Sequence, residues 1–332
     1  MPYLFGSQMM WEFNLSDVVA MRTGALSGIF VGGVLLLAGC AADPGGPAGA
    51  VGGTSDPRVA LGEECARAVS GPDKAALSMV EQGLIVGPDP VPDILSDPQR
   101  RARLDLPVVK AAARCLAVKN YTAYSRLAFS YKDEAEFWGL LDLAMIRIRN
   151  GDSMLVSMLQ MKNYWLASQG RVLGKPPLRN LSETAALLAS YMYVVALADG
   201  AKCPNRQIAA TRIPVLLVEA KPVFASLAGR SADELRRLSD MVLALEARTL
   251  SWRRDDAVLC NASPEALASM RFYETSTPGD AQRWDQSIRA LTGPGGWPPQ
   301  SDEQSLAAFR EGVRRNLPSV LRDVSGKAAA TP

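Results

Sequence analysis

The 332-residue chain contains no histidine. This absence excludes Ser-His-Asp and Cys-His catalysis, and it excludes zinc sites built on imidazole ligands. A strong excess of one charge is also missing, because 36 basic and 34 acidic side chains leave a net charge of +2. Such a balance does not favour nucleic acid as a partner. Glycine-rich phosphate loops, dinucleotide fingerprints and calcium loops are absent as well, so we expect no cofactor and no metal.

Long apolar runs are scarce. The uncharged stretch between Thr23 and Gly39 is shorter than the roughly 20 residues of a membrane-spanning helix, and it is typical of the apolar part of a secretory signal. It closes on Leu37-Ala38-Gly39-Cys40, which resembles the lipobox of bacterial lipoprotein precursors. The resemblance covers about the first 40 residues. It implies a diacylglyceryl group on the Cys40 thiol, cleavage before Cys40 and acylation of the new amino group.

The lipobox resemblance also implies a location. Two or three acyl chains, at about 0.8 kcal/mol per buried CH2, anchor a protein durably in a membrane. Ala41, rather than Asp, follows Cys40, and in such precursors this implies passage to the outer membrane. We therefore expect a lipid-anchored protein on the periplasmic side of the outer membrane.

The chain divides into five expected segments. Residues 1–20 contain Glu12 and Asp17 but no basic residue, so we expect translation to start at Met21 and residues 1–20 to be an extension of the gene model. A flexible tether is expected after Cys40, because residues 41–56 hold five glycines and two prolines. The segments are a signal peptide at 21–39, the lipidated cysteine and tether at 40–56, an α-helical domain at 57–325 and a disordered tail at 326–332.

The cysteine count is small but informative. Four cysteines remain after Cys40: Cys65, Cys115, Cys203 and Cys260. An even number in an oxidising compartment favours disulfides, and four cysteines allow three pairings. We favour Cys65–Cys115 and Cys203–Cys260, because each pair joins neighbouring helical segments, with four buried free thiols as the alternative. A metal site is disfavoured because no Cys-x-x-Cys occurs.

The sequence has no run of alternating β-branched residues bounded by turns, as a strand would have, whereas patterns typical of helix starts are frequent. Asp56-Pro57 and Ser231 to Glu234 have the pattern of helix starts, and Ala185–Ala198 is apolar enough for a buried core helix. The sequence predicts an all-α fold of about ten to twelve helices in consecutive antiparallel hairpins, bundle or solenoid-like, stapled by disulfides. The expected helical segments are 57–70, 72–84, 107–118, 120–131, 133–150, 152–166, 185–198, 214–227, 231–248, 263–275, 281–291 and 301–322, the last cut at Pro318.

Acidic residues give the candidates for catalysis. Asp133, Glu134 and Glu136 are candidates for a catalytic pair of carboxylates. Carboxylates at the start of a helix, however, also interact favourably with the helix dipole. Asp255-Asp256 is interpreted as solvated surface. Cleavage of cell-wall glycan needs only carboxylates, and Glu134, Glu136 or Glu274 would then supply the acid. No flanking motif supports any of them, so we assign no catalytic residue.

Basic and aromatic residues give the candidates for binding. The doublets at 100–101, 236–237, 253–254 and 314–315 are expected on separate exposed faces. The aromatic residues between Tyr121 and Trp138 are expected in the core rather than in a sugar-binding groove. Trp297, in a Gly/Pro-rich loop, either packs onto the body or contacts a partner.

These observations favour a non-enzymatic envelope lipoprotein that binds or scaffolds another envelope component. The partners would be the membrane, through the lipid anchor, and an envelope protein. The alternatives are the carboxylate-dependent glycan-cleaving enzyme and a carrier of a small apolar ligand, which would need an internal cavity.

Overall fold

The computed structural model of the chain describes residues 56–67, 92–253, 256–260, 297–298 and 302–329. These residues form helices, and no strand occurs among them. The expected all-α fold class is therefore confirmed. Other predictions fall outside the described residues: the lipobox and Cys40, most of the tether, Glu274, and the helices expected at 72–84, 263–275 and 281–291.

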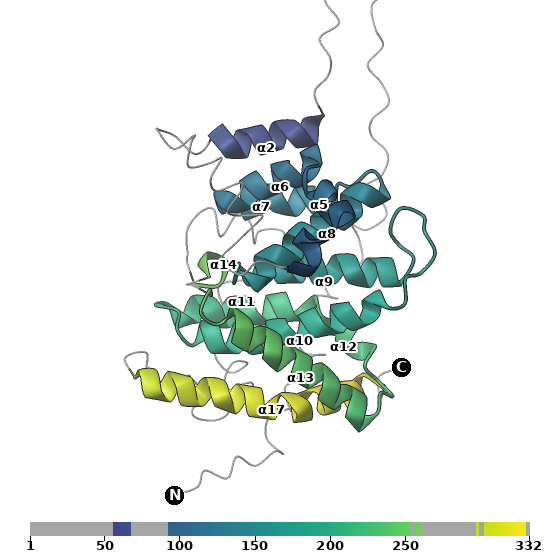
Figure 1. Cartoon of the computed structure of the whole chain (residues 1–332). Helices are drawn as coiled ribbons and strands as arrows, with labels where there is room; N and C mark the ends of the chain where they lie inside the picture. Colours follow the sequence, from purple (N-terminus) through teal and green to yellow (C-terminus); the bar gives the residue numbers. More distant parts are fainter. Residues whose placement is uncertain (1–55, 68–91, 254–255, 261–296, 299–301, 330–332) are drawn as a thin grey trace, which may run out of the picture.

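The helices form a bundle-like stack. Figure 1 shows α2 (Pro57–Arg67) at one end and α17 (Glu303–Ala329) at the other, with α10 (Leu181–Gly200) between them. Helices adjacent in sequence pack together, α6 with α7, α8 with α9, and α9 with α10. The other helices are α4 (Pro92–Leu95), α5 (Pro98–Leu104), α6 (Pro107–Ala117), α7 (Tyr121–Leu127), α8 (Glu134–Arg149), α9 (Met154–Ser168), α11 (Arg206–Val218), α12 (Lys221–Ala225), α13 (Ala232–Thr249) and α14 (Ala257–Cys260).

Local sequence explains where several helices begin. The Asp133 carboxylate accepts a hydrogen bond from the backbone N–H of Glu136 at 2.9 Å and starts α8. Ser231 and Glu234 form the predicted capping box of α13. Helix α6 begins at Pro107, where the missing N–H costs no helical hydrogen bond.

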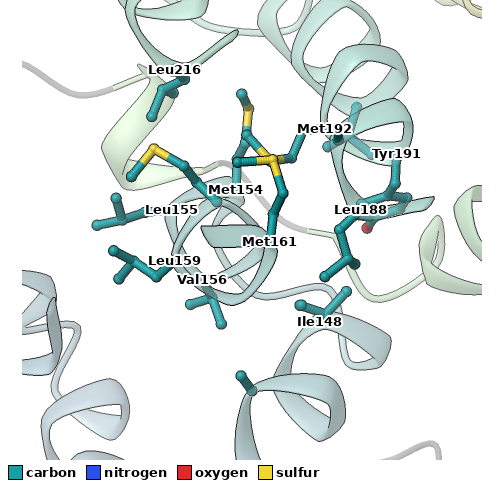
Figure 2. Packing of buried hydrophobic residues seen from close by; sticks show 14 of the residues in the cluster. Ile148, Met154, Leu155, Val156, Leu159, Met161, Leu188, Tyr191, Met192 and Leu216 are labelled. Carbon is teal, nitrogen blue, oxygen red and sulfur yellow. The ribbon is translucent and has the colours of Figure 1, made fainter. Parts of the chain in front are cut away.

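Helix α10 lies at the centre of the core. By length and apolar composition it is a candidate membrane span. All residues from 188 to 200 are nevertheless buried, against neighbours that include α9, α13 and α17. Figure 2 shows Met161 of α9 on the side facing Leu188 and Met192 of α10. The predicted core helix at 185–198 is therefore confirmed within the longer α10.

One helix begins earlier than the sequence predicts. A helix starting at Pro214 is expected, but α11 already starts at Arg206. The side chain of Asn205 caps it by accepting a hydrogen bond from the backbone N–H of Gln207 at 3.1 Å. The expected segment began too late, because the side chain of Asn205, upstream of Pro214, caps the helix at Arg206.

The last helix also differs from its prediction. It is expected to be cut at Pro318, but α17 continues through this residue to Ala329. Val313, Leu317 and Val320 on both sides of Pro318 are buried. Their packing outweighs the one hydrogen bond that an internal proline removes. The tail expected at 326–332 is helical as far as Ala329, so the boundary placed at 325 is too early.

Two disulfides connect the expected cysteines. Cys65 of α2 is bonded to Cys115 of α6, with a Cα–Cα distance of 5.0 Å. Cys203, after α10, is bonded to Cys260 at the end of α14, with a Cα–Cα distance of 4.9 Å. These are the pairs favoured from the sequence, and the four thiols are not free.

Candidate functional site

The carboxylates singled out in the sequence hold structure together. Glu134 is exposed and accepts a hydrogen bond from Trp138 Nε1 at 3.3 Å. Glu136 pairs with Arg58, with a distance of 3.0 Å between Oε1 and Nη2. Neither belongs to the lining of the pocket described next. The preference for a structural role at this helix start is therefore supported.

A polar pocket of about 210 Å³ lies at another place. It forms where the turns after α6 and α8 meet the end of α10 and the turn after α13. Charged groups of both signs face it, together with one tryptophan. The lining residues are Lys119, Tyr121, Arg147, Asn150, Gly151, Asp152, Ser153, Val195, Asp199, Trp252, Arg253 and Asp256.

Asp152 is the carboxylate at the junction of α8 and α9. It accepts hydrogen bonds from Arg147 Nε at 2.7 Å, from the Tyr121 hydroxyl at 3.0 Å and from the backbone N–H of Ser153 at 2.7 Å. Burial, and then the charges of Asp152 and Asp256, raise the pKa of Tyr121 well above its usual value. Tyr121 therefore stays protonated and acts as a hydrogen-bond donor.

Asp256 connects two helix starts. Its carboxylate accepts hydrogen bonds from the Ser153 hydroxyl at 2.9 Å and from the backbone N–H of Met154 at 2.7 Å, at the start of α9. It also accepts from the backbone N–H groups of Val258 at 2.9 Å and Leu259 at 3.2 Å. Burial raises its pKa, although these donors oppose the rise. The interpretation of Asp256 as solvated surface is wrong, because two helices use it as a cap.

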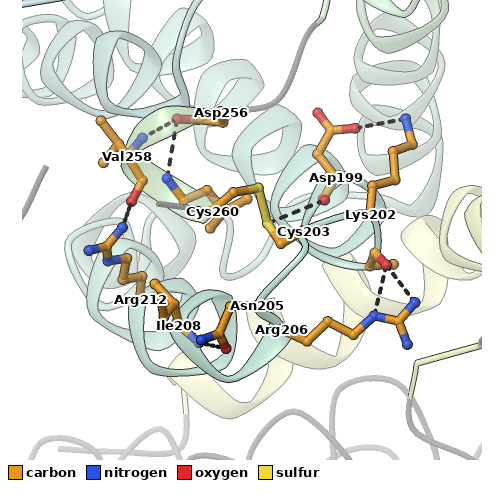
Figure 3. The surroundings of a disulfide bond; sticks show 12 residues. Asp199, Lys202, Cys203, Asn205, Arg206, Ile208, Arg212, Asp256, Val258 and Cys260 are labelled. Carbon is orange, nitrogen blue, oxygen red and sulfur yellow. Dashed lines mark hydrogen bonds and ion pairs between the residues drawn. A yellow bond between two sulfur atoms is a disulfide. The ribbon is translucent and has the colours of Figure 1, made fainter. Parts of the chain in front are cut away.

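The second disulfide lies between two acidic residues of the pocket, as Figure 3 shows. The Sγ of Cys203 is 3.7 Å from the backbone oxygen of Asp199, and the backbone N–H of Cys260 donates to the backbone oxygen of Asp256 at 2.7 Å. The covalent bond therefore ties together the two segments that carry these carboxylates.

Arg253 continues the charged network into the interior. Its Nε lies 2.7 Å from Asp199 Oδ2, and its Nη2 lies 2.6 Å from Glu246 Oε1. Its side chain is only 2% exposed. The expectation that this arginine doublet lies on an exposed face is therefore wrong for Arg253, because two buried carboxylates hold it.

Glu246 is the fully buried end of the network. Besides Arg253, it contacts Arg310, with 2.7 Å between Oε2 and Nη2, and Arg314, both from α17. Burial alone would raise its pKa, but hydrogen bonds from Arg310 and Arg253 prevail and lower the pKa to about 2. Glu246 is therefore ionised at neutral pH and joins α13 to α17.

Lys119 occupies a special backbone position. It follows α6 with φ of 56°, in the left-handed region. The backbone N–H of Asn120 bonds to the oxygen of Cys115 and that of Lys119 to the oxygen of Leu116, the Schellman pattern that usually places glycine here. Lys119 is exposed, and its ammonium makes no ion pair within the described part of the chain.

Trp297 packs onto the body. The ring is partly buried and belongs to the residues packed against the core. A Cβ placed on Gly200, at the end of α10, would lie only 3.1 Å from Trp297 Cζ2. This close contact favours the packing alternative over a partner contact for Trp297.

The sequence did not identify the pocket: Tyr121, Arg253 and Asp256 were considered for other roles, and the remaining lining residues were not singled out. Lys119, Asp152 and Trp252 lie in short turns after helices, and none belongs to a motif. A signal existed in Lys119-Asn120, because a lysine follows α6 where glycine is favoured. The other lining residues come from helices and turns spread between positions 121 and 256, and no local pattern brings them together.

Comparisons with known proteins add no assignment. No protein-family model matches the chain, and no curated protein or solved structure matches it. Within the described ranges, no group of three or more Cys, Asp or Glu side chains is arranged to hold a metal ion. The site is therefore defined by its own geometry, which is a small polar pocket backed by buried ion pairs.

Proposed function

We propose that the protein is a lipid-anchored envelope lipoprotein that binds or scaffolds another envelope component at the periplasmic face of the outer membrane, without catalysing a reaction. The observation that carries the proposal is the pairing of all four cysteines that follow the lipobox. Disulfides of this kind form and persist in oxidising compartments, such as the periplasm. The lipobox-like Leu37-Ala38-Gly39-Cys40 supplies the matching route of export and attachment.

The state of the pocket carboxylates supports a role without catalysis. A glycan-cleaving enzyme needs one carboxylic acid and one carboxylate free to reach the scissile bond. Asp152 and Asp256 accept hydrogen bonds from three and four donors, respectively, and Asp199 is paired with Arg253. Their oxygens are engaged in holding helices together, which argues against the enzymatic alternative. The charged groups that line this pocket likewise argue against its use for an apolar ligand.

The tether gives the docking proposal a physical basis. The described body begins at Asp56, 16 residues after Cys40. A flexible glycine-rich chain of this length spans about 20 Å, which keeps the body near the membrane while leaving it free to reorient. Confinement near a membrane partner raises the effective concentration without any new contact.

The experiment is metabolic labelling with palmitate in cells that produce the protein, followed by separation of the membranes. We expect labelled protein in the outer-membrane fraction, and an unlabelled Cys40→Ser variant that leaves it. The matched control is the Cys65→Ser/Cys115→Ser variant, which loses two cysteines and their disulfide but keeps Cys40 and should stay labelled. An unlabelled wild-type chain, or a Cys40→Ser chain that remains in the membrane as before, would refute the anchor.

The binding role needs its own experiment. Crosslinking in intact cells, followed by purification under denaturing conditions, should recover an envelope protein with the wild-type chain. The Cys40→Ser chain should recover much less of it, because confinement is lost. Recovery of no partner above background would count against scaffolding and leave the anchoring result unaffected.

A further inference from the structure

We propose that the pocket between the turns after α6, α8 and α13 binds one acidic sugar unit, that is, a sugar ring bearing a carboxylate or a phosphate. The site goes beyond the proposed scaffolding role and does not depend on the lipid anchor. Three features of the pocket carry the argument: an exposed indole, cations with unused donors, and carboxylates already engaged.

Trp252 provides the stacking surface. It is one of three large hydrophobic side chains that are markedly exposed in the described part of the chain, and the only one of the three that lines the pocket. Gly151, with φ of 71°, lets the neighbouring turn approach it, since a Cβ there would lie 2.5 Å from the carbonyl carbon of Trp252. This contact fixes the backbone of Trp252 beside the pocket, and an exposed indole at that place suits the apolar face of a sugar ring.

Lys119 and Arg147 provide the donors. Arg147 uses Nε for Asp152, and the structure gives its two Nη groups no hydrogen bond within the described residues. Lys119 is exposed and makes no ion pair among the described residues. A chain that keeps lysine in a left-handed position where glycine is favoured retains some strain, and such strain collects at functional sites.

The carboxylates determine the sign of the ligand. Asp152, Asp199 and Asp256 are all engaged by protein donors, as described above. The groups left for a ligand are therefore cationic donors, which favour a negatively charged, acceptor-rich molecule. The volume of about 210 Å³ is below the 300–1,000 Å³ range of pockets for drug-sized ligands, so a single ring is the appropriate size.

The test is isothermal titration of the full chain, in a detergent without a sugar headgroup, with glucuronic acid, glucose 6-phosphate, glucose and inorganic phosphate. Glucuronic acid or glucose 6-phosphate should bind at least about tenfold more tightly than glucose and inorganic phosphate, because only they combine ring and charge. Equal binding of glucose would overturn the role of the cations. Equal binding of inorganic phosphate would overturn the role of the ring, and no binding of any probe would overturn the site.

Methyl glucuronide separates two sources of the same chemistry. Binding equal to that of glucuronic acid assigns the pocket to the end of a glycan chain, since the methyl group stands for the next sugar. Binding of the free acid alone assigns it to a free sugar acid. Both results support the acidic-sugar site.

Variants distinguish binding from folding. Lys119→Gly should weaken binding of the acidic sugar about tenfold while raising the urea midpoint, because glycine relieves the left-handed strain. Lys110→Gln, on the exposed part of α6, is the matched charge control and should leave affinity unchanged. Trp252→Leu should weaken binding, whereas Phe129→Leu, an exposed aromatic residue outside the pocket, should not. Unchanged affinity in both Lys119→Gly and Trp252→Leu would overturn the proposal.

Discussion

The helices at the two ends of the described body are held to it by different chemistry. Helix α2 is fixed covalently through Cys65–Cys115, and a partly buried ion-pair cluster of Arg58 with Asp56 and Glu136 adds to this. Helix α17 has no disulfide. Instead, its residues Arg310 and Arg314 form ion pairs with Glu246 of α13, whose side chain is 0% exposed. Val313, Leu317 and Leu321 of α17 are buried around this contact.

The comparison shows two solutions to holding a terminal helix. Where a covalent link holds the helix, we expect partly exposed ion pairs to add at most about 1 kcal/mol to the free energy of unfolding. A buried carboxylate is different, because removing it leaves desolvated arginines without a counter-charge. We therefore expect α2 to be sensitive to reduction and α17 to be sensitive to acid.

The largest expected effect is the loss of a disulfide. The Cys65→Ser/Cys115→Ser variant should lose about 4 kcal/mol of the free energy of unfolding, as estimated from the loop of 50 residues that the bond closes. The Cys203→Ser/Cys260→Ser variant, with a separation of 57, should lose a similar amount. Urea titration measures both. The two differ in the pocket, since only the second bond joins the segments of Asp199 and Asp256; acidic-sugar binding should weaken in the second variant only.

The next effect concerns the buried carboxylate. Glu246→Gln should cost about 3 kcal/mol, because a neutral amide leaves Arg253, Arg310 and Arg314 poorly compensated. Limited proteolysis should then cleave α17 before the rest of the body. Glu311→Gln is the matched control: it removes an exposed carboxylate beside two of the same arginines, at a cost of at most about 1 kcal/mol. Equal effects of the two variants would contradict the role of burial.

The same carboxylate predicts acid sensitivity. The folded-state pKa of Glu246 is about 2, below the ordinary value of 4.5, so its contribution is complete above pH 4.5 and is lost as the pH falls through 2. The loss should reach about 3 kcal/mol over this range. Urea titrations at several pH values, for the wild type and Glu246→Gln, separate the contribution of Glu246 from that of other acids. Asp256, for example, has a raised pKa, so its contribution to stability decreases as the pH rises. Parallel pH curves for the two proteins would refute the assignment.

The smallest effect is expected at the other end. Arg58→Gln removes the ion pairs with Asp56 and Glu136 and should cost about 1 kcal/mol, since these groups are partly exposed and α2 stays attached through its disulfide. Thermal unfolding measures the change. In the Cys65→Ser/Cys115→Ser variant, Arg58→Gln should lower the free energy of unfolding by more than it does in the wild type, because the ion pairs then help to hold α2. Simple additivity would show that the disulfide does not mask them.

Much of the fold was predictable because its signals are local. The Ser231–Glu234 capping box and the helix start at Asp133 depend on residues three apart, and both predictions are confirmed. The apolar run of α10 identified the core helix. The failure at Pro318 has the opposite origin, since packing outweighed a local preference, whereas at Pro214 a local signal, the Asn205 cap, was missed.

The pocket was not predictable for the same physical reason. Asp199 and Arg253 are 54 residues apart, Glu246 and Arg310 are 64 apart, and Ser153 and Asp256 are 103 apart. A charged residue has the same local pattern whether it ends in solvent or beside a distant partner. Arg253 therefore resembled surface, and Asp256 did too.

The sequence by itself determined the helical class, most helix starts and the even set of cysteines, because caps, apolar runs and composition act over a few residues. Tertiary structure alone decided which charges are buried, which arginines meet Glu246, and which turns surround the pocket. These outcomes depend on desolvation and on contacts between distant segments, and both exist only after the helices have packed.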